Sequence, residues 1–81
     1  MQMEKEIHIG KLIRRKLKEE ERTVAWLARQ MGCDRSRLYL IFKNQHIDTE
    51  LLLKFAEILH HDFFAHYSSL LAENQSVTEN V

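Results

Sequence analysis

The chain has 81 residues, of which 44% are hydrophobic and 30% charged, with no proline, two glycines and one cysteine. One cysteine excludes an intramolecular disulfide, and a domain of this size has no spare volume for a deep catalytic pocket. The net charge is zero, yet residues 1–43 carry 11 Lys and Arg against 6 Asp and Glu, and residues 44–81 carry 1 against 6. This polarity favours a binding module with one face directed at an anion, the alternative being chance segregation of charge in a helical protein.

The apolar periodicity predicts an all-α domain that begins with a helix from Ile9 to Glu19. A second, short helix follows Thr23, which is a good N-cap, and ends at Gly32, which adopts the left-handed conformation without steric cost. The outer face of the first helix is basic and carries Lys11, Arg14, Arg15 and Lys18. The predicted inward residues of the two helices are Ile9, Leu12, Ile13 and Leu17, then Val24, Leu27, Ala28 and Met31.

Asp34 is predicted to cap a third helix from Arg35 to Lys43, and Asn44 to close it in the left-handed conformation. Ile47 and Asp48 have the pattern of a hydrophobic staple and a cap for a fourth helix. The predicted inward residues are Leu38, Ile41 and Phe42 in the third helix and Leu51, Leu52, Phe55, Ala56 and Leu59 in the fourth.

The polar residues from His60 to Asp62 interrupt the helical spacing of apolar residues, which starts again after them. Asp62 is predicted to cap a fifth helix. From Asn74 onward the residues are polar and aperiodic, which predicts a frayed tail. The chain is therefore divided into a flexible N-terminus (1–6), one domain (7–73) and a polar C-terminal tail (74–81). The apolar residues of the fifth helix are Phe63, Phe64, Tyr67, Leu70 and Leu71.

The second and third predicted helices have the sequence form of a helix-turn-helix. They are joined by Gly32-Cys33-Asp34, and the second of the two has a polar outer face. Ala28 supplies a small side chain where the two helices cross, and Leu38 and Ile41 are spaced to pack back onto the first. The spacing, more than any single residue, carries the motif.

The stretch from Val24 to Lys43, VAWLARQMGCDRSRLYLIFK, resembles the helix-turn-helix of the lambda-repressor and Cro-like family. The resemblance extends to Ile9-Gly10-Lys11 and to residues 48–59, and it covers roughly residues 7–70. It implies a compact five-helix, lambda-repressor-like helix-turn-helix domain that binds double-stranded DNA. The helix from Arg35 to Lys43 would enter the major groove, as expected of a transcriptional regulator.

The resemblance also implies which residues contact DNA. An Arg guanidinium at the start of the third helix can donate two hydrogen bonds to a guanine edge, and an outward leucine can contact a thymine methyl group. The base contacts implied are Arg35, Ser36, Arg37, Tyr39 and Leu40. Contacts to backbone phosphates, which position the protein without reading sequence, are implied for Thr23, Lys43, Asn44 and Gln45.

Four residues depart from the family pattern. Val24 stands where the family often has Gln, Leu40 occupies an outward position that is usually polar, and Glu21 replaces a common glycine. Lys16 takes a place that is commonly held by a buried Leu. The first two departures, together with the zero net charge, support an alternative function. In that alternative the chain is a protein-interaction adaptor or an antitoxin-like module that keeps the fold with weak or no DNA reading.

The fifth helix carries more apolar surface than a closing helix needs. Related folds bind near-palindromic DNA as two-fold dimers, so we expect a homodimer through this helix. The alternative is that the same residues only seal the monomer core. The predicted interface comprises Phe64, Tyr67, Leu70 and Leu71.

Other functional classes are disfavoured. No nucleophile lies beside a base and no glycine-rich phosphate loop is present, so we expect no enzymatic activity. His60, His61 and His66 with Asp62 are metal-ligand residue types, but adjacent histidines at a helix end point in different directions and no fourth ligand is placed. We expect no metal, no cofactor and no small-molecule ligand, and interpret these histidines as helix-terminal groups that interact with local dipoles.

The sequence predicts a cytoplasmic protein that does not enter a membrane. Its longest apolar runs, Leu38 to Phe42 and Leu51 to Leu53, are far shorter than the roughly 20 residues of a membrane span. Met1 to Glu6 is polar, and no apolar signal segment follows it.

Overall fold

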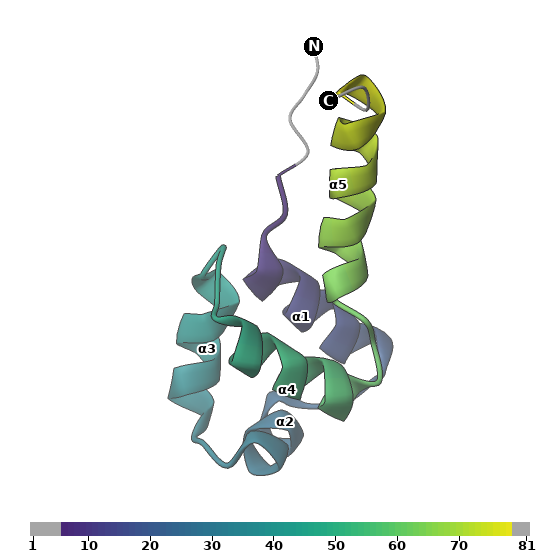
Figure 1. Ribbon diagram of the computed structural model, residues 1–81. Helices are drawn as coiled ribbons and strands as arrows, with labels where there is room; N and C mark the ends of the chain where they lie inside the picture. Colours follow the sequence, from purple (N-terminus) through teal and green to yellow (C-terminus); the bar gives the residue numbers. More distant parts are fainter. Residues whose placement is uncertain (1–5, 79–81) are drawn as a thin grey trace.

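The computed structural model describes residues 6–78, with side chains described as far as Asn74. Five α-helices and no β-strand occur in this part of the chain, which confirms the predicted all-α class (Figure 1). None of these helices is long and apolar enough to cross a membrane. The helices are α1 (Ile9–Glu19), α2 (Val24–Met31), α3 (Arg35–Lys43), α4 (Thr49–Leu59) and α5 (Phe64–Thr78).

The ends of the helices are set by local side-chain caps. Side-chain oxygens of Thr23, Asp34 and Asp48 each accept a hydrogen bond from the backbone N–H three residues later, at 3.0, 3.3 and 2.7 Å. Such bonds satisfy N–H groups that have no partner inside the helix. Gly32 ends α2 with φ of 74°, as predicted. These four residues therefore explain why α2, α3 and α4 begin and α2 ends where the sequence predicts.

The predicted left-handed conformation of Asn44 is wrong. Asn44 is extended, with φ −84° and ψ 133°. The cause lies in α1, whose first N–H groups need acceptors from outside the helix. The N–H of Gly10 donates to the carbonyl oxygen of Asn44 and the N–H of Ile9 to that of Gln45, both at 3.0 Å. The extended connection after α3 therefore provides hydrogen-bond acceptors for the first N–H groups of α1.

A single apolar core lies among α1, α2, α3, α4 and the residue that precedes α5. No polar side chain among the described residues is buried in it. Most predicted inward residues are buried, while Leu12, Val24, Leu51 and Ala56 are half-buried at its edge. The core consists of Ile9, Ile13, Leu17, Leu27, Ala28, Met31, Leu38, Ile41, Phe42, Leu52, Phe55, Leu59 and Phe63.

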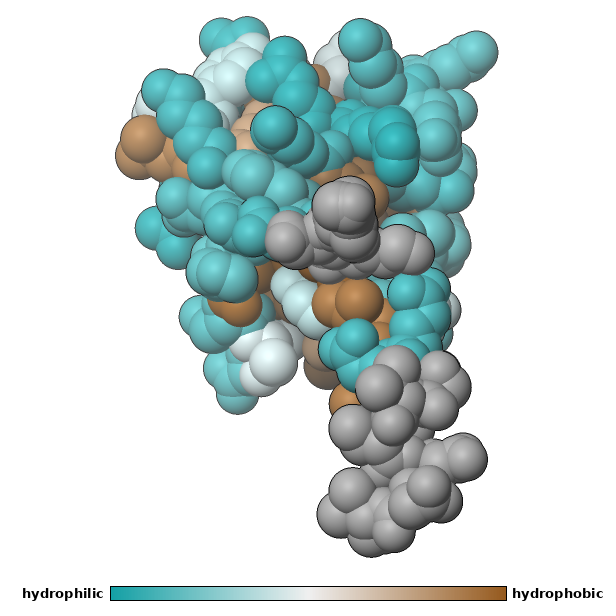
Figure 2. Space-filling model, turned by 90° about the horizontal axis from the view of Figure 1, so that it is seen from above, coloured by the Kyte–Doolittle hydropathy of each residue, from teal (hydrophilic) through white to brown (hydrophobic). Residues whose placement is uncertain are grey.

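Helix α5 projects from the other four helices (Figure 1). Phe63, immediately before it, is fully buried, and Phe64 packs against the core, whereas Tyr67 and Leu71 are 38% and 56% exposed. Seen from the end where both termini lie, the surface is mostly hydrophilic, with a few hydrophobic residues showing among the hydrophilic ones (Figure 2).

The two predicted terminal segments are only partly described. Helix α5 continues to Thr78, past the predicted start of the tail at Asn74, because this stretch contains no glycine or proline to end it. The last three residues of the predicted tail, and all but Glu6 of the predicted flexible N-terminus, lie outside the described residues.

Candidate nucleic-acid interface

Helices α1 and α3 lie side by side and touch at their backbones. Gly10 makes this approach feasible, because a Cβ atom at Gly10 would overlap the carbonyl groups of Phe42 and lie 2.6 Å from the carbonyl oxygen of Ile41. Any side chain at this position would push the two helices apart. Gly10 therefore fixes the basic outer face of α1 beside α3.

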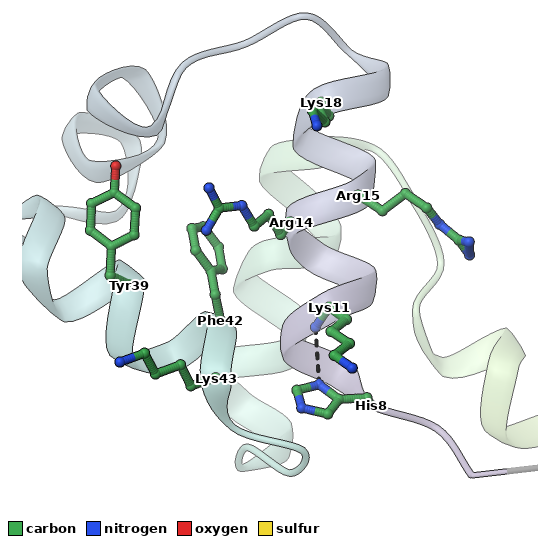
Figure 3. Close-up of a pocket in the computed structure, with 8 residues that line it drawn as sticks. All are labelled: His8, Lys11, Arg14, Arg15, Lys18, Tyr39, Phe42 and Lys43. Atoms are coloured by element: carbon green, nitrogen blue, oxygen red, sulfur yellow. Dashed lines mark hydrogen bonds between the residues drawn. The ribbon is translucent and has the colours of Figure 1, made fainter.

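A groove of about 670 Å³ opens between the two helices (Figure 3). Its walls are basic and aromatic, and no carboxylate is among its lining residues. Arg15 forms its edge, since it points away from α3 in Figure 3. We call this surface the basic groove; it is lined by His8, Lys11, Arg14, Arg15, Lys18, Tyr39, Phe42 and Lys43.

Arg14 stands at the centre of the basic groove and is held by aromatic rings. Its guanidinium carbon lies 5.3 Å from the ring centroid of Phe42 and 5.7 Å from that of Tyr39. These are cation–π distances, and the rings fix the guanidinium without neutralising it. Arg14 forms no ion pair with any residue that the structure describes. Its N–H donors therefore remain available to an anion.

The other cations of the basic groove are similarly unneutralised. Within the described part of the chain, neither Lys11, Lys18 nor Lys43 forms a salt bridge, whereas Lys16, on another face of α1, lies 3.2 Å from a carboxylate oxygen of Glu20. Unpaired cations gathered in one concave surface produce a positive potential that attracts polyanions. The basic groove is thus chemically suited to phosphate groups.

His8 closes one end of the basic groove. Its Nδ1 accepts a hydrogen bond from the backbone N–H of Lys11 at 3.1 Å and so caps α1 (Figure 3). A neutral imidazole that accepts at Nδ1 carries its proton on Nε2. The Nε2–H of His8 is therefore a hydrogen-bond donor at this end of the basic groove, in addition to the side-chain donors of the cations.

The exposed face of α3 carries all five residues predicted to contact bases. Among the described residues, Arg35 and Arg37 are exposed and form no ion pair, and Leu40 is the most exposed large hydrophobic side chain, at 62%. The hydroxyl of Ser36 donates to a carboxylate oxygen of Asp34 at 3.1 Å, so it already has a partner. The fifth residue, Tyr39, packs beside Arg14 in the basic groove.

The residues predicted to contact phosphates are spread more widely. Lys43 lines the basic groove, while Thr23 lies at the start of α2 and uses its hydroxyl oxygen as a cap. The backbone N–H of Asn44 donates to the carbonyl of Ile41 at 2.9 Å, which leaves the side chain of Asn44 for the predicted phosphate contact. Gln45 is half-buried after α3, with its carbonyl oxygen bound to α1.

The basic groove contains candidate functional residues to which the sequence alone assigns no role. Lys11, Arg14 and Lys18 were identified as an outer basic face, and their spacing of three and four residues places them along one side of a helix. The sequence contains no signal that this side lies against α3.

Within residues 6–74, no three side chains of His, Cys, Asp or Glu are grouped closely enough to hold a metal ion.

Comparisons of the whole chain with family models, with curated proteins and with solved structures gave no match.

Proposed function

We propose that this protein binds double-stranded DNA in a sequence-specific manner as a lambda-repressor-like helix-turn-helix domain and acts as a transcriptional regulator. In this proposal α2 and α3 are the two helices of the motif, and α3 enters the major groove. The observation that carries the proposal is the basic groove, whose cations lie unpaired beside the exposed face of α3.

The two surfaces have different roles in the proposed complex. Lys11, Arg14, Lys18 and Lys43 neutralise backbone phosphates, which supplies affinity and orientation without sequence preference. Arg35 and Arg37, at the start of α3, donate to base edges, and each bidentate contact to guanine contributes about 1–3 kcal/mol of discrimination. Because Tyr39 and Lys43 belong to both α3 and the basic groove, the surfaces are continuous.

The proposed active form is a homodimer that uses α5. Tyr67 and Leu71 are exposed on the projecting part of this helix, and Leu70 is half-buried between them. Phe64 packs against the core of its own chain, so its predicted role in the interface is not part of the proposal. A two-fold contact through α5 would leave α3 of each copy free for one half-site.

Selection of randomised DNA duplexes tests the proposed function. The purified full chain is incubated with the library, washed at low and at near-physiological salt, and the retained duplexes are sequenced. We expect an inverted repeat with half-sites about 10 bp apart, and binding that weakens with the logarithm of salt concentration at a slope of about −0.9 per phosphate contact. Failure to retain any duplex at low salt would rule out DNA binding.

Substitutions in α3 should separate base reading from backbone binding. In Arg35→Ala or Arg37→Ala, we expect the selected motif to lose its preference at one position, because the base-edge donor is removed. In Lys43→Ala, affinity should fall by a similar factor for all sequences. The measurement is a comparison of the selected motif and of affinity for matched and mismatched duplexes. Unchanged motifs in both arginine variants would contradict the assigned base contacts.

The exposure of Leu40 favours one second candidate, a protein-interaction adaptor or antitoxin-like module with the same fold. An apolar side chain that is 62% exposed on α3 is chemically suited to a protein partner as well as to a thymine methyl group. For an adaptor, Leu40→Glu would abolish partner binding while the arginine variants would leave it unchanged. For the DNA reader, all three variants alter duplex binding.

A further inference from the structure

Helix α5 is held to the rest of the molecule mainly through its first turn. Phe63 is inserted into the core and Phe64 packs at its edge, but of the residues from 65 to 74 only His66 and Leu70 are partly covered. His66 lines a small hollow against α1 together with His61 from the connection between α4 and α5. The few groups at this junction therefore decide how firmly α5 is attached.

His61 and His66 form a direct pair at this junction. Their Nε2 atoms are 3.1 Å apart, and both side chains are partly buried. The ring of Phe63 packs against the pair, with its centroid 4.6 Å from that of His61 and 6.4 Å from that of His66. The buried phenylalanine thus supports two imidazoles that clamp the start of α5.

The geometry of the pair is that of a shared proton. The ring centroids are 5.3 Å apart while the nitrogens are 3.1 Å apart, so the two nitrogens lie almost on the line that joins the rings. Along this line one Nε2–H points at the lone pair of the other Nε2, as in a hydrogen bond. Two imidazoles that bind one metal ion instead aim their lone pairs at a third point away from this line. The arrangement therefore holds a proton better than it holds a metal.

The number of protons on the pair controls this contact. With both rings neutral, or with one extra proton, a single N–H lies between the two nitrogens and the bond is made. With two extra protons, both Nε2 atoms carry hydrogen and two cations face each other, so the contact is repulsive. The closed pair therefore binds at most one extra proton, whereas two separated imidazoles bind two.

Charged groups around the pair act in both directions. Burial lowers the pKa of His61 below its ordinary value of 6.5, and the charges of Lys16 and His66 lower this pKa further, while Asp62 and Glu19 oppose the shift. Because the separated state binds more protons, the contribution of the pair to the attachment of α5 is fully present above pH 6.5 and decreases as the pH falls below that value. The other charged groups that line the hollows beside the pair are Glu6, Arg15 and Glu73.

We propose that His61 and His66 form a proton-controlled latch that holds the first turn of α5 against the connection from α4 when they share one hydrogen and releases it when both are charged. Release changes the direction of the helix that carries Tyr67 and Leu71, the exposed apolar residues of α5. The latch is a property of the isolated chain and does not depend on DNA binding.

Nuclear magnetic resonance on the full chain tests the latch. The Cε1–H signals of the histidines are titrated, and amide-exchange protection factors, which correct for the intrinsic pH dependence of exchange, are compared at about pH 7.5 and about pH 5.5. We expect the titration midpoint of His61 to lie below that of an ordinary histidine, and the Cε1–H signal of His66 to respond to the protonation of His61. Protection in the first turns of α5 should fall by up to about tenfold per pH unit, while that of α1 to α4 stays unchanged.

Two variants complete the experiment. In His66→Gln, the protection of α5 should depend less on pH, and the midpoint of His61 should move only part of the way toward 6.5, because burial and the charge of Lys16 still lower its pKa. In the control His46→Gln, which changes an exposed histidine outside the pair, the pH response should persist. A His66 signal that does not respond to the protonation of His61, or protection of α5 that does not change with pH in the unaltered chain, would overturn the proposal. Shifts of both rings at equimolar Zn²⁺ would instead identify a metal site and also overturn it.

Discussion

Replacing Gly10 by alanine is expected to destabilise the protein by about 3 kcal/mol or more, the upper end of the range for overpacked sites. The added Cβ would overlap backbone carbonyl groups of Phe42 and Ile41 in α3. Backbone at this place cannot rotate away, because the N–H of Gly10 and that of Ile9 are bonded to the chain that follows α3. Helix α1 would have to separate from α3, and the core between them would open.

The direction of this effect is opposite to that of helix propensity. Alanine in a helix interior is ordinarily more favourable than glycine by about 1 kcal/mol, so the same change at an uncrowded helical glycine would stabilise the protein. A loss of stability in Gly10→Ala therefore reports the close approach of the two helices. It is measured as the change in the free energy of unfolding in urea, followed by circular dichroism.

Gly32→Ala is the matched control for this prediction. Gly32 has φ of 74°, but no atom lies within 4 Å of the position that a Cβ would take. Its substitution therefore costs only the strain of the left-handed conformation, about 1–2 kcal/mol. We expect Gly10→Ala to be the more damaging change. If Gly32→Ala destabilises the protein more, α1 and α3 are not in backbone contact.

The sequence predicts the helices well because their ends depend on near neighbours. Thr23, Asp34 and Asp48 each bond an N–H only three residues away, so residue type and position are sufficient to place the start of a helix. Gly32 likewise ends α2 through a conformation that its own lack of a side chain permits. The same locality explains why the all-α class could be predicted.

Features that depend on residues distant in the sequence could not be predicted. Asn44 is extended because α1, more than thirty residues earlier, needs its carbonyl group. The basic groove requires both a basic face on α1 and the contact at Gly10 that turns this face toward α3. The sequence indicates only that His61 and His66 lie near a helix end. Their pairing depends on the insertion of Phe63 into the core, which aligns the two rings.

Removing charge from the basic groove should weaken DNA binding more than removing the same charge elsewhere. We expect the double variant Lys11→Gln with Lys18→Gln to lose affinity on the order of tenfold for each phosphate contact at about 0.1 M salt. Neither side chain packs on the aromatic rings or forms an ion pair with the described residues, so the fold should be retained. The salt slope should become shallower by about 0.9 for each contact, while the selected DNA motif stays the same.

A control with the same loss of charge separates a local contact from a general electrostatic effect. Arg29 in α2 and Lys54 in α4 are exposed and do not line the basic groove. Because Lys54 Nζ donates to the carbonyl oxygen of Met31 at 3.5 Å, the free energy of unfolding of this control is measured as well. The double variant Arg29→Gln with Lys54→Gln therefore has the same net charge as the groove variant. A general attraction to DNA would lower affinity equally in both. If phosphates bind in the basic groove, only the groove variant should show a large loss of affinity and a shallower salt slope. Equal losses of affinity in the two variants would contradict the assignment of this groove to the DNA backbone.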